Sequence, residues 1–281
     1  MSNSSLGERM KSYENISRNY LTRRIPAIIR IDGKAFHTFT KGMKKPFDRV
    51  LMSAMQETMK YLCENIQGCV LGYTQSDEIT LVLTDYEKIT TDAWFGYNIQ
   101  KMSSIAASMA SVAFNKFFYK AIANYITSDE AFSIFLSDDE GKKKETKSYF
   151  VTLYNASNKG AVFDARAFSI PKDEVCNSLI WRQQDATRNS IEAVGQAHFS
   201  HNILQSKSCS MIQDMLWREK NINWNDLPTD CKRGACCYRK PSTECIETKT
   251  GEHIEVSRNR WTIDKDIPIF TQNRAFIEKW I

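Results

Sequence analysis

Three carboxylates lie where predicted β segments end. Asp32 follows the short apolar run 27–31, and Asp77 and Glu78 separate two β-rich runs, 69–74 and 79–83, that predict a hairpin. If the first strand lies beside this hairpin, the three carboxylates converge at one edge of a sheet. Carboxylates without a His or Cys ligand set favour a hard cation such as Mg²⁺. A pair of such ions suits nucleotidyl transfer, because it activates an attacking hydroxyl and stabilises a leaving pyrophosphate.

Each acidic motif has an ordinary structural explanation when taken alone. Asp-Gly after a strand and Ser-Asp-Glu in a hairpin are common turn sequences. Their joint occurrence beside basic residues is what favours a metal site. Gly33 lets the backbone approach a ligand closely, and Lys41, Lys44 and Lys45 could meet triphosphate oxygens. The chain has no Gly-x-x-x-x-Gly-Lys-Ser/Thr run, so it is not a P-loop protein.

The elements that position these residues follow from periodicity and punctuation. Apolar residues between 51 and 66 recur at intervals of three and four, which predicts an amphipathic helix from near Pro46 to near Gly68. The charged run 138–145 has no apolar residue and predicts a solvated loop. Further helices are expected over 91–125, 172–194 and 200–219, and further strands over 150–153 and 161–168.

The length of 281 residues allows one large domain or two small ones. We expect residues 1–137 to form a catalytic core, 138–149 a charged loop, and 150–281 the rest of the sheet with a helical and tail extension packed on it. Trp261 and Trp280 are the expected packing anchors of the polar tail.

Basic residues concentrate in the first part of the chain. The net charge is +5, but residues 1–60 hold twelve Lys or Arg against five Asp or Glu, a local +7, which leaves −2 for the remainder. This asymmetry indicates a phosphate-bearing or nucleic-acid partner. The eight cysteines have irregular spacing, unlike a secreted disulfide framework, and their spacing fits zinc poorly. We therefore expect a cytoplasmic protein with reduced thiols and no membrane partner.

Several motifs occur in a fixed order along the chain. They are Arg30–Phe39 (RIDGKAFHTF), Lys45–Asp48 (KPFD), Gly72–Glu78 (GYTQSDE), Phe163–Arg166 (FDAR), Trp181–Asp185 (WRQQD), and Asn225–Pro228 (NDLP) leading to Lys232–Gly234 (KRG). Together they resemble the signature of the tRNA-His guanylyltransferase family over roughly residues 10–240. An ordered set of this kind is far more specific than any one motif.

The resemblance implies an α+β fold, with a polymerase-like palm domain of β-α-β-β core and antiparallel sheet, plus a helical C-terminal extension. It implies a 3′-to-5′ nucleotidyltransferase that adds nucleotides to the 5′ end of tRNA. The 5′ phosphate is first activated, commonly by ATP, and the 3′-hydroxyl of an incoming nucleoside triphosphate then attacks it. The implied cofactor is Mg²⁺ (two ions), the implied substrates are ATP, GTP or other nucleoside triphosphates and tRNA, and the implied assembly is a homotetramer.

Site residues follow from the same match. Asp32 and Asp77 fall on the metal carboxylates, Gly33 supplies its backbone carbonyl, and Glu78 supports them as a catalytic carboxylate. The positions that match the nucleotide site are Lys34, Ala35, Phe36, His37, Lys45, Asp48, Ser76 and Lys101. The basic residues expected to contact tRNA are Arg182, Arg188, Lys207, Lys232 and Arg233, of which the last two are favoured by the NDLP and KRG match.

One departure from the family pattern bears on the substrate. In the eukaryotic branch, Trp-Arg-Gln-x-Asp is followed by Cys-His-Ile-Asn-Asn, whereas here Thr187 stands in place of that His. The chain in this respect resembles bacterial-type guanylyltransferase-like members, which are associated with template-dependent repair of truncated tRNA 5′ ends. Two alternatives stay open: a tRNA-His guanylyltransferase that adds G at position −1, and a non-catalytic nucleotide- or RNA-binding protein with a palm frame.

Overall fold

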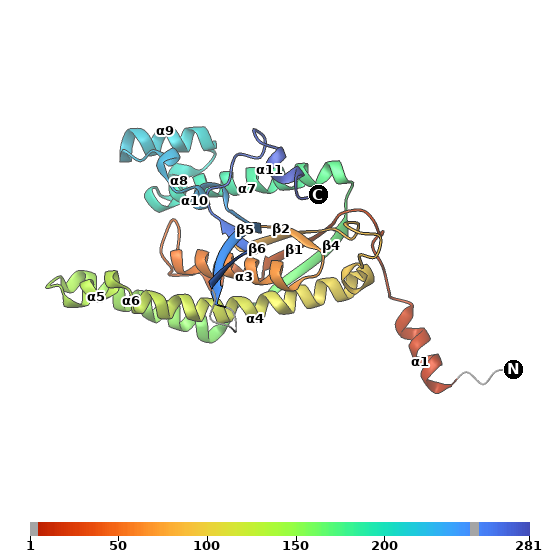
Figure 1. The fold of residues 1–281 in the computed structure, drawn as a ribbon. Coiled ribbons are helices and arrows are strands. Elements are labelled where there is room, and N and C mark those ends of the chain that lie inside the picture. Colours follow the sequence, from red (N-terminus) through yellow and green to blue (C-terminus); the bar gives the residue numbers. More distant parts are fainter. Residues whose placement is uncertain (1–4, 248–252) are drawn as a thin grey trace.

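A six-stranded antiparallel sheet forms the centre of the molecule (Figure 1). The computed structural model describes residues 5–247 and 253–281. The strand order is β4-β1-β3-β2-β5-β6. The strands are β1 (Ala27–Gly33), β2 (Cys69–Gln75), β3 (Glu78–Leu83), β4 (Phe163–Ser169), β5 (Ala235–Glu247) and β6 (His253–Asp264). The expected α+β class and the β-α-β-β core are confirmed, because β1, helix α3 (Arg49–Asn65), β2 and β3 follow one another around this sheet.

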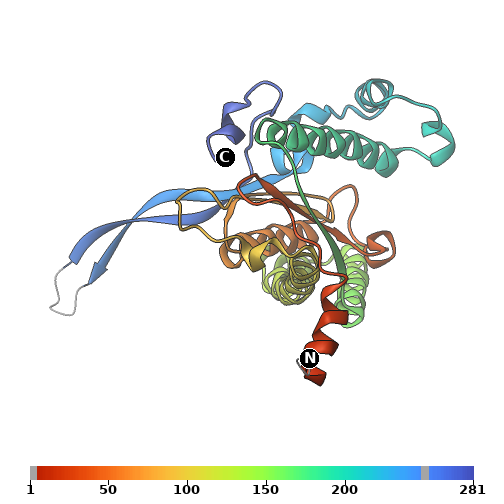
Figure 2. The ribbon, with the colours of Figure 1, turned by 90° about the vertical axis from the view of Figure 1, so that its right-hand side faces the viewer.

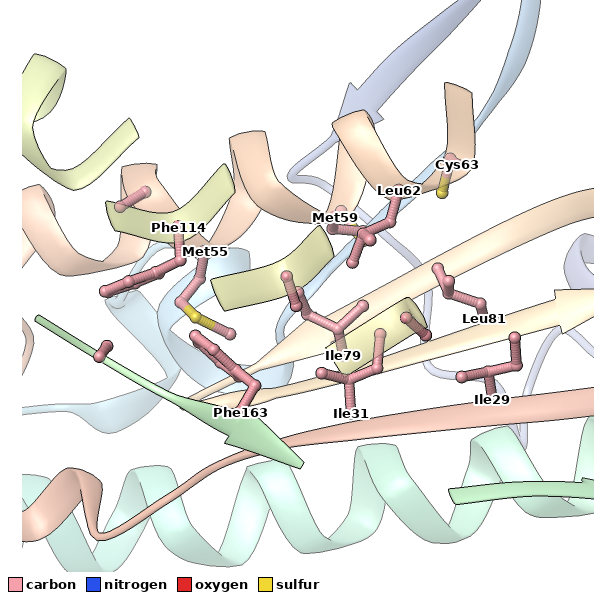
Figure 3. Close-up of a cluster of buried hydrophobic side chains, with 14 of the residues drawn as sticks. Ile29, Ile31, Met55, Met59, Leu62, Cys63, Ile79, Leu81, Phe114 and Phe163 are labelled. Atoms are coloured by element: carbon pink, nitrogen blue, oxygen red, sulfur yellow. The ribbon is translucent and has the colours of Figure 1, made fainter. Parts of the chain in front are cut away.

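Alternation along the central strands creates two cores, one on each face of the sheet. Ile29, Ile31 and Ile79 lie on the face that α3 and α4 (Ile99–Ile126) cover (Figure 3). Ile28 and Val82 lie on the opposite face, against α7 (Lys172–His198). Because both faces are buried, the central strands read as nearly continuous apolar runs.

Helix α3 starts later than the expected position near Pro46, because Asp48 caps it. One carboxylate oxygen of Asp48 accepts hydrogen bonds from the backbone N–H groups of Val50 and Leu51 at 3.0 and 3.1 Å. The other oxygen accepts from the Tyr149 hydroxyl at 2.7 Å. Asp48 is therefore buried and joins the start of α3 to a helix about a hundred residues away.

Helices α4, α5 (Asp129–Leu136) and α6 (Glu140–Lys159) form an elongated layer on the α3 side of the sheet (Figure 1). The loop expected over 138–149 and the strand expected over 150–153 are wrong, since residues 140–159 form one helix. Asp139 caps that helix by accepting the Lys142 N–H at 2.9 Å. The buried stripe of α6 has helical spacing and consists of Thr146, Tyr149, Leu153 and Ala156. The charged run forms the cap and the exposed first turns of this helix.

The second face of the sheet carries the remaining helices. The helix expected over 172–194 is confirmed as α7, and the one expected over 200–219 is divided into α8 (His201–Leu204) and α9 (Cys209–Lys220). The helix expected over 91–125 is confirmed as α4, preceded by a 3₁₀ turn, η1 (Trp94–Tyr97). The other short elements are α1 (Leu6–Asn15), α2 (Phe36–Phe39), η2 (Trp224–Asp226), α10 (Thr229–Arg233) and α11 (Ala275–Glu278).

Strands β5 and β6 form a long hairpin that extends beyond the sheet (Figure 2). The sequence predicted a polar tail from Lys240 onward and no strands there, whereas most of this segment belongs to the hairpin. Trp261 in β6 packs against the α3–α4 core and Trp280 against the α7 core, as expected of anchors. No helix in the described residues is long and apolar enough to cross a membrane. The domain boundaries expected at residues 137 and 150 remain a prediction.

Replacing Asp48 by Ala should destabilise the protein more than the loss of an ordinary helix cap. The substitution removes the cap and takes an acceptor from the buried Tyr149 hydroxyl, so we expect a loss of about 2–4 kcal/mol in the free energy of unfolding. The control is Ser208→Ala, which removes the exposed cap of α9 and should cost about 1 kcal/mol. Urea unfolding followed by circular dichroism measures both variants. Equal costs would contradict the dual role of Asp48.

Candidate active site

The end of β1 is joined directly to the turn between β2 and β3. The N–H of Gly33 donates to the carbonyl oxygen of Asp77 at 3.1 Å. Asp32 lies opposite Glu78 in the β1–β3 register. In that turn Ser76 has a left-handed backbone with φ of 50°, an unusual conformation for a residue other than glycine. The expected convergence of these segments at one edge of the sheet is thus confirmed.

Asp32 and Asp77 form a close acidic pair. Burial raises the pKa of the Asp77 carboxyl, and the nearby charge of Asp32 raises it further. Neither carboxylate forms an ion pair within residues 5–247 and 253–281. Two adjacent acidic groups without a protein cation repel each other, and a bound divalent ion would relieve that repulsion. The donor set therefore fits Mg²⁺, which prefers a few carboxylates and completes its coordination with water and phosphate.

Glu78 lies opposite Asp32 in the β1–β3 register, on the same face of the sheet, and its side chain contacts α7. Its carboxylate accepts a hydrogen bond from Arg182 at 2.9 Å, and both side chains are about 90% buried. Burial raises the pKa of Glu78, and the Arg182 charge opposes that rise. Across the described residues no group of three or more His, Cys, Asp or Glu side chains is arranged to hold a metal ion. The metal set expected from the family match, Asp32, Asp77 and the Gly33 carbonyl with Glu78 in support, stays a prediction.

Arg182 is a buried partner of Glu78 rather than an exposed cation. A second carboxylate, Asp185, lies 3.4 Å from the same guanidinium. This corrects the expectation that Arg182 presents a free charge to tRNA. The sequence did not reveal this ion pair, because Glu78 and Arg182 are separated by more than a hundred residues.

Close backbone packing shapes the segment after Asp32. A Cβ atom at Gly33 would lie 2.2 Å from the ring of Phe36, so a larger residue requires that ring to move. Phe36 is itself buried among Phe39, Phe114 and Phe163. This ring is part of the core, and only its edge reaches the cavity beside the acidic pair.

A cavity of about 520 Å³ opens beside Asp77. Of the residues expected at the nucleotide, His37, Lys45 and Ser76 line it with exposed side chains. Ala35 lines it too, with a left-handed φ of 54°. The remaining lining residues include Gly33, Phe36, Thr40, Met43, Lys44, Pro46, Asp48 and Leu51. The cavity therefore combines a carboxylate with basic and backbone groups, as a triphosphate site requires.

Three of the residues expected to contact the nucleotide either make contacts within the protein or lie outside the cavity. Asp48 borders the cavity, but its oxygens serve α3 and Tyr149. Lys34 is exposed, and its backbone N–H donates to Val162 at 2.8 Å. Lys101 lies in the first turn of α4, with its ammonium 5.9 Å from the ring of Phe95. It does not line the cavity.

Sequence reasoning missed a second, larger cavity that adjoins the first. It has a volume of about 940 Å³ and lies between the segment 42–47 and helices α4, α5 and α6. The Lys44 ammonium lies 4.7 and 4.8 Å from the ring centroids of Tyr125 and Tyr149 at this junction. Its other basic lining residues include Lys142 and Lys144. The basic cluster at residues 41–45 is visible in the sequence, and Tyr125 belongs to an expected helix, but Tyr149 falls in the segment 138–149 that was expected to be a loop.

The other residues expected to contact tRNA are spread over the α7 side. Arg188 is exposed and pairs with Asp185. Lys207 is exposed between α8 and α9. Lys232 is buried, and its ammonium donates to the carbonyl of Asn225. Burial also lowers the pKa of Lys232. Arg233 is half-buried. The expectation that Lys232 presents an exposed charge to tRNA is therefore wrong.

Breaking the Glu78–Arg182 pair should be costly whatever the ligand. Arg182→Leu leaves Glu78 buried without its cation, so we expect a loss of about 3–5 kcal/mol in the free energy of unfolding. The double variant Arg182→Leu with Glu78→Leu should recover a large part of that loss, because no buried charge remains unpaired. Urea unfolding of the single and double variants tests this coupling. A single variant as stable as the original protein would disprove a structural role for Arg182.

Comparison with known proteins places this geometry in a family. The family model of tRNAHis guanylyltransferase matches residues 7–171. A solved structure of a bacterial tRNA(His) guanylyltransferase-like protein in complex with ATP is 41% identical, covers 99% of both chains and has a TM-score of 0.75. A structure of such a bacterial protein in complex with GTP is 39% identical, covers 98% of both chains and has a TM-score of 0.72.

More distant relatives agree. The probable tRNA(His) guanylyltransferase of Dictyostelium discoideum is 25% identical over 92% of this chain and 96% of its own. The solved tRNA(His) guanylyltransferase of Saccharomyces cerevisiae, 17% identical over 88% of this chain and 95% of its own, shares the fold with a TM-score of 0.59. The family match spans more than half of the chain and includes Asp32, Asp77 and Glu78. The chain therefore belongs to the tRNAHis guanylyltransferase family of nucleotidyltransferases.

Proposed function

We propose that this protein adds nucleotides to the 5′ end of tRNA, in the 3′-to-5′ direction, at the Asp32–Asp77 edge of its sheet. The observation that carries the proposal is the acidic pair without a protein cation, beside a cavity lined with lysines. A protein that only bound nucleotides would have no use for two carboxylates near phosphates, because they repel the ligand. This argues against the non-catalytic alternative.

The proposed reaction has two steps. First, an oxygen of the tRNA 5′ monophosphate attacks the α-phosphorus of ATP, forms a 5′ adenylylated end and releases pyrophosphate. Then the 3′-hydroxyl of the incoming nucleoside triphosphate attacks the activated 5′ phosphorus, forms the new phosphodiester bond and releases AMP. The hydroxyl gives its proton to solvent water as the bond forms. In this proposal Lys45 and Lys44 meet the triphosphate in the cavity, since both line it as exposed or partly stacked cations.

Asp32, Asp77 and the carbonyl of Gly33 are the groups that would hold Mg²⁺ in this proposal. Bound Mg²⁺ would supply charge neutralisation for the attacking and leaving oxygens. The hydrogen bond from Gly33 to Asp77 and the ion pair of Glu78 with Arg182 keep the two acidic segments in place. These contacts make the site a rigid one before any ligand binds.

Template-dependent repair of truncated tRNA is the favoured form of this activity. The chain is 41% identical to the bacterial guanylyltransferase-like protein, but only 25% identical to the Dictyostelium tRNA(His) guanylyltransferase. Thr187, where the eukaryotic branch has His, lies half-buried on α7 on the same helix as Arg182. Addition of G at position −1 of tRNA-His is the second candidate, because the family model bears that name.

We also propose that the protein is a homo-oligomer, with a tetramer as the family expectation. Apolar side chains that are 39–72% exposed recur every seven residues along the outer face of α4. They are Ile105, Val112, Tyr119 and Ile126. A seven-residue spacing keeps one stripe on one side of a helix, and a stripe of this length suits another helix as its cover. The expected cytoplasmic location remains a prediction.

Extension of truncated tRNA tests the activity. The substrates are a 5′-monophosphorylated tRNA that lacks its first nucleotide and a full-length tRNA-His, each with Mg²⁺, ATP and all four nucleoside triphosphates. We expect templated extension of the truncated tRNA. Asp77→Asn should lower the extension rate by about a thousandfold or more, since it removes a metal carboxylate, while tRNA affinity stays within about threefold.

The control variant is Asp138→Asn, which removes an exposed carboxylate outside the site and should extend tRNA at the original rate. Extension of tRNA-His alone would favour the second candidate. No product from either tRNA would refute the enzyme, and a fully active Asp77→Asn would refute the assignment of the site.

The oligomer proposal is tested by the mass in solution. Val112→Arg places a charge in the middle of the α4 stripe and should lower the molecular mass measured by light scattering after gel filtration. Lys116→Arg, on the same helix, keeps the charge and should leave the mass unchanged. A monomeric original protein, or a Val112→Arg variant with unchanged mass, would contradict the proposed interface.

A further inference from the structure

Two pairs of like charges face each other across strands β1 and β4. Arg30 lies opposite Arg166, and Asp32 lies opposite Asp164. Alternation along β1 puts Arg30 and Asp32 on the α7 face, together with Ile28. Like charges directly opposite in an antiparallel pair destabilise a sheet. Proteins keep destabilising arrangements of this kind mainly at functional sites, so the paired like charges indicate a ligand-binding surface.

Arg30 is the unpaired member of this group. Arg166 has a carboxylate at 3.5 Å, on Asp164. Arg30 is half-buried and has no ion pair within the described residues, and its guanidinium carbon lies 5.5 Å from the ring centroid of Trp181 on α7. The charges facing it are the carboxylates of Asp32 and Glu78, and Glu78 already pairs with Arg182. Arg30 is therefore able to accept an anionic partner.

Trp181 supplies an aromatic surface beside that cation. The side chain is 54% exposed, so a ligand can reach much of its ring. The guanidinium of Arg182 lies 3.7 Å from its centroid, and Arg182 is itself held by Glu78. Two guanidinium groups thus lie near the indole, and about half of the side chain stays accessible to solvent. An exposed aromatic ring beside arginine side chains is a combination with which proteins bind nucleic-acid strands.

The position along β1 relates this surface to the reaction. Arg30 precedes Asp32 by two residues, a distance of about 7 Å along a strand. The nucleoside triphosphate cavity lies beside Asp77 and is lined by Lys44 and Lys45, and it does not include Arg30 or Trp181. The α7 face is thus left for the other substrate, whose 5′ phosphate must reach the same carboxylates.

We propose that Arg30, Arg166 and Trp181 bind the 5′-terminal nucleotide of the RNA substrate. The terminal base stacks on the exposed part of the Trp181 indole, and the adjacent backbone phosphate pairs with Arg30 and Arg166. This rests on the proposed function, because it assigns the RNA side of the same reaction. The three residues position the RNA, and the acidic pair carries the chemistry.

Binding of truncated tRNA without nucleoside triphosphate tests the stacking. We expect 5′-monophosphorylated tRNA lacking its first nucleotide to quench the tryptophan fluorescence of the original protein, and Trp181→Phe to lose part of that quench while binding within about threefold. Trp181→Ala should bind roughly 5- to 100-fold more weakly, the range that loss of one stacked base produces. A Trp181→Ala variant that binds as tightly as Trp181→Phe would overturn the proposal, as would a Phe variant that binds as weakly as Ala.

The salt dependence of the same binding tests the arginine. Arg30→Gln should reduce the slope of log affinity against log salt concentration by about 0.7 to 0.9, the effect of one phosphate contact. The control Arg218→Gln removes an exposed arginine on α9 and should leave the slope unchanged. Identical slopes for both variants would overturn the phosphate contact.

Unchanged ATP affinity and melting temperature show that each variant is folded. Since none of these measurements needs turnover, a protein that stacks RNA on Trp181 but extends none refutes the proposed function alone. One that extends RNA with Trp181→Ala at the original affinity refutes this inference alone.

Discussion

The antiparallel register of β1 with β3 is the constraint on which the rest of the molecule depends. It places Asp32 opposite Glu78 and lets the Gly33 N–H reach the Asp77 carbonyl. Because side chains alternate along a strand, a shift by one residue would send Asp32 to the α3 face and Ile31 to the other. The apolar residues on both faces oppose such a shift. The hydrophobic pattern that folds the sheet therefore also sets the position of the acidic pair.

The two faces of the sheet surround the acidic pair with different groups. On the α3 face, loop 42–47 and the α4–α6 helices enclose the cavity with its lysines. On the α7 face, the buried Glu78–Arg182 pair holds the first residue of β3 in place, and the Arg182 guanidinium also packs on the ring of Trp181. The Asp32–Asp77 pair lies where the two faces meet, at the end of β1. Two substrates can therefore approach the same carboxylates from different sides.

Local sequence signals predicted the centre of the molecule well. The strand before Asp32 and the hairpin around Asp77 are marked by apolar β-branched runs and by turn residues, so their positions needed no long-range information. The ion pair of Glu78 could not be predicted from local signals, because its partner Arg182 lies on a helix more than a hundred residues away. The contact of Asp48 with Tyr149 is likewise a long-range one that local sequence signals do not reveal.

Composition misled the prediction where an element is mostly solvated. Helix α6 buries only a narrow stripe, and its charged face resembles a loop in sequence. Among its described residues the β5–β6 hairpin is buried only at its base, around Cys236 and Tyr238, and charged or polar residues occupy much of the rest. The sheet pairing that forms it is a long-range property. Hence the second cavity, which α6 helps to line, was invisible from the sequence.

Direct measurement of metal binding tests the central claim, that Asp32 and Asp77 together hold the catalytic ions. Mn²⁺ can replace Mg²⁺ as a paramagnetic probe, and electron paramagnetic resonance counts the ions bound per chain in the presence of a non-hydrolysable nucleoside triphosphate. The account predicts strong binding in the original protein and at least tenfold weaker binding in Asp32→Asn and in Asp77→Asn. Undiminished Mn²⁺ binding in the double variant would contradict it.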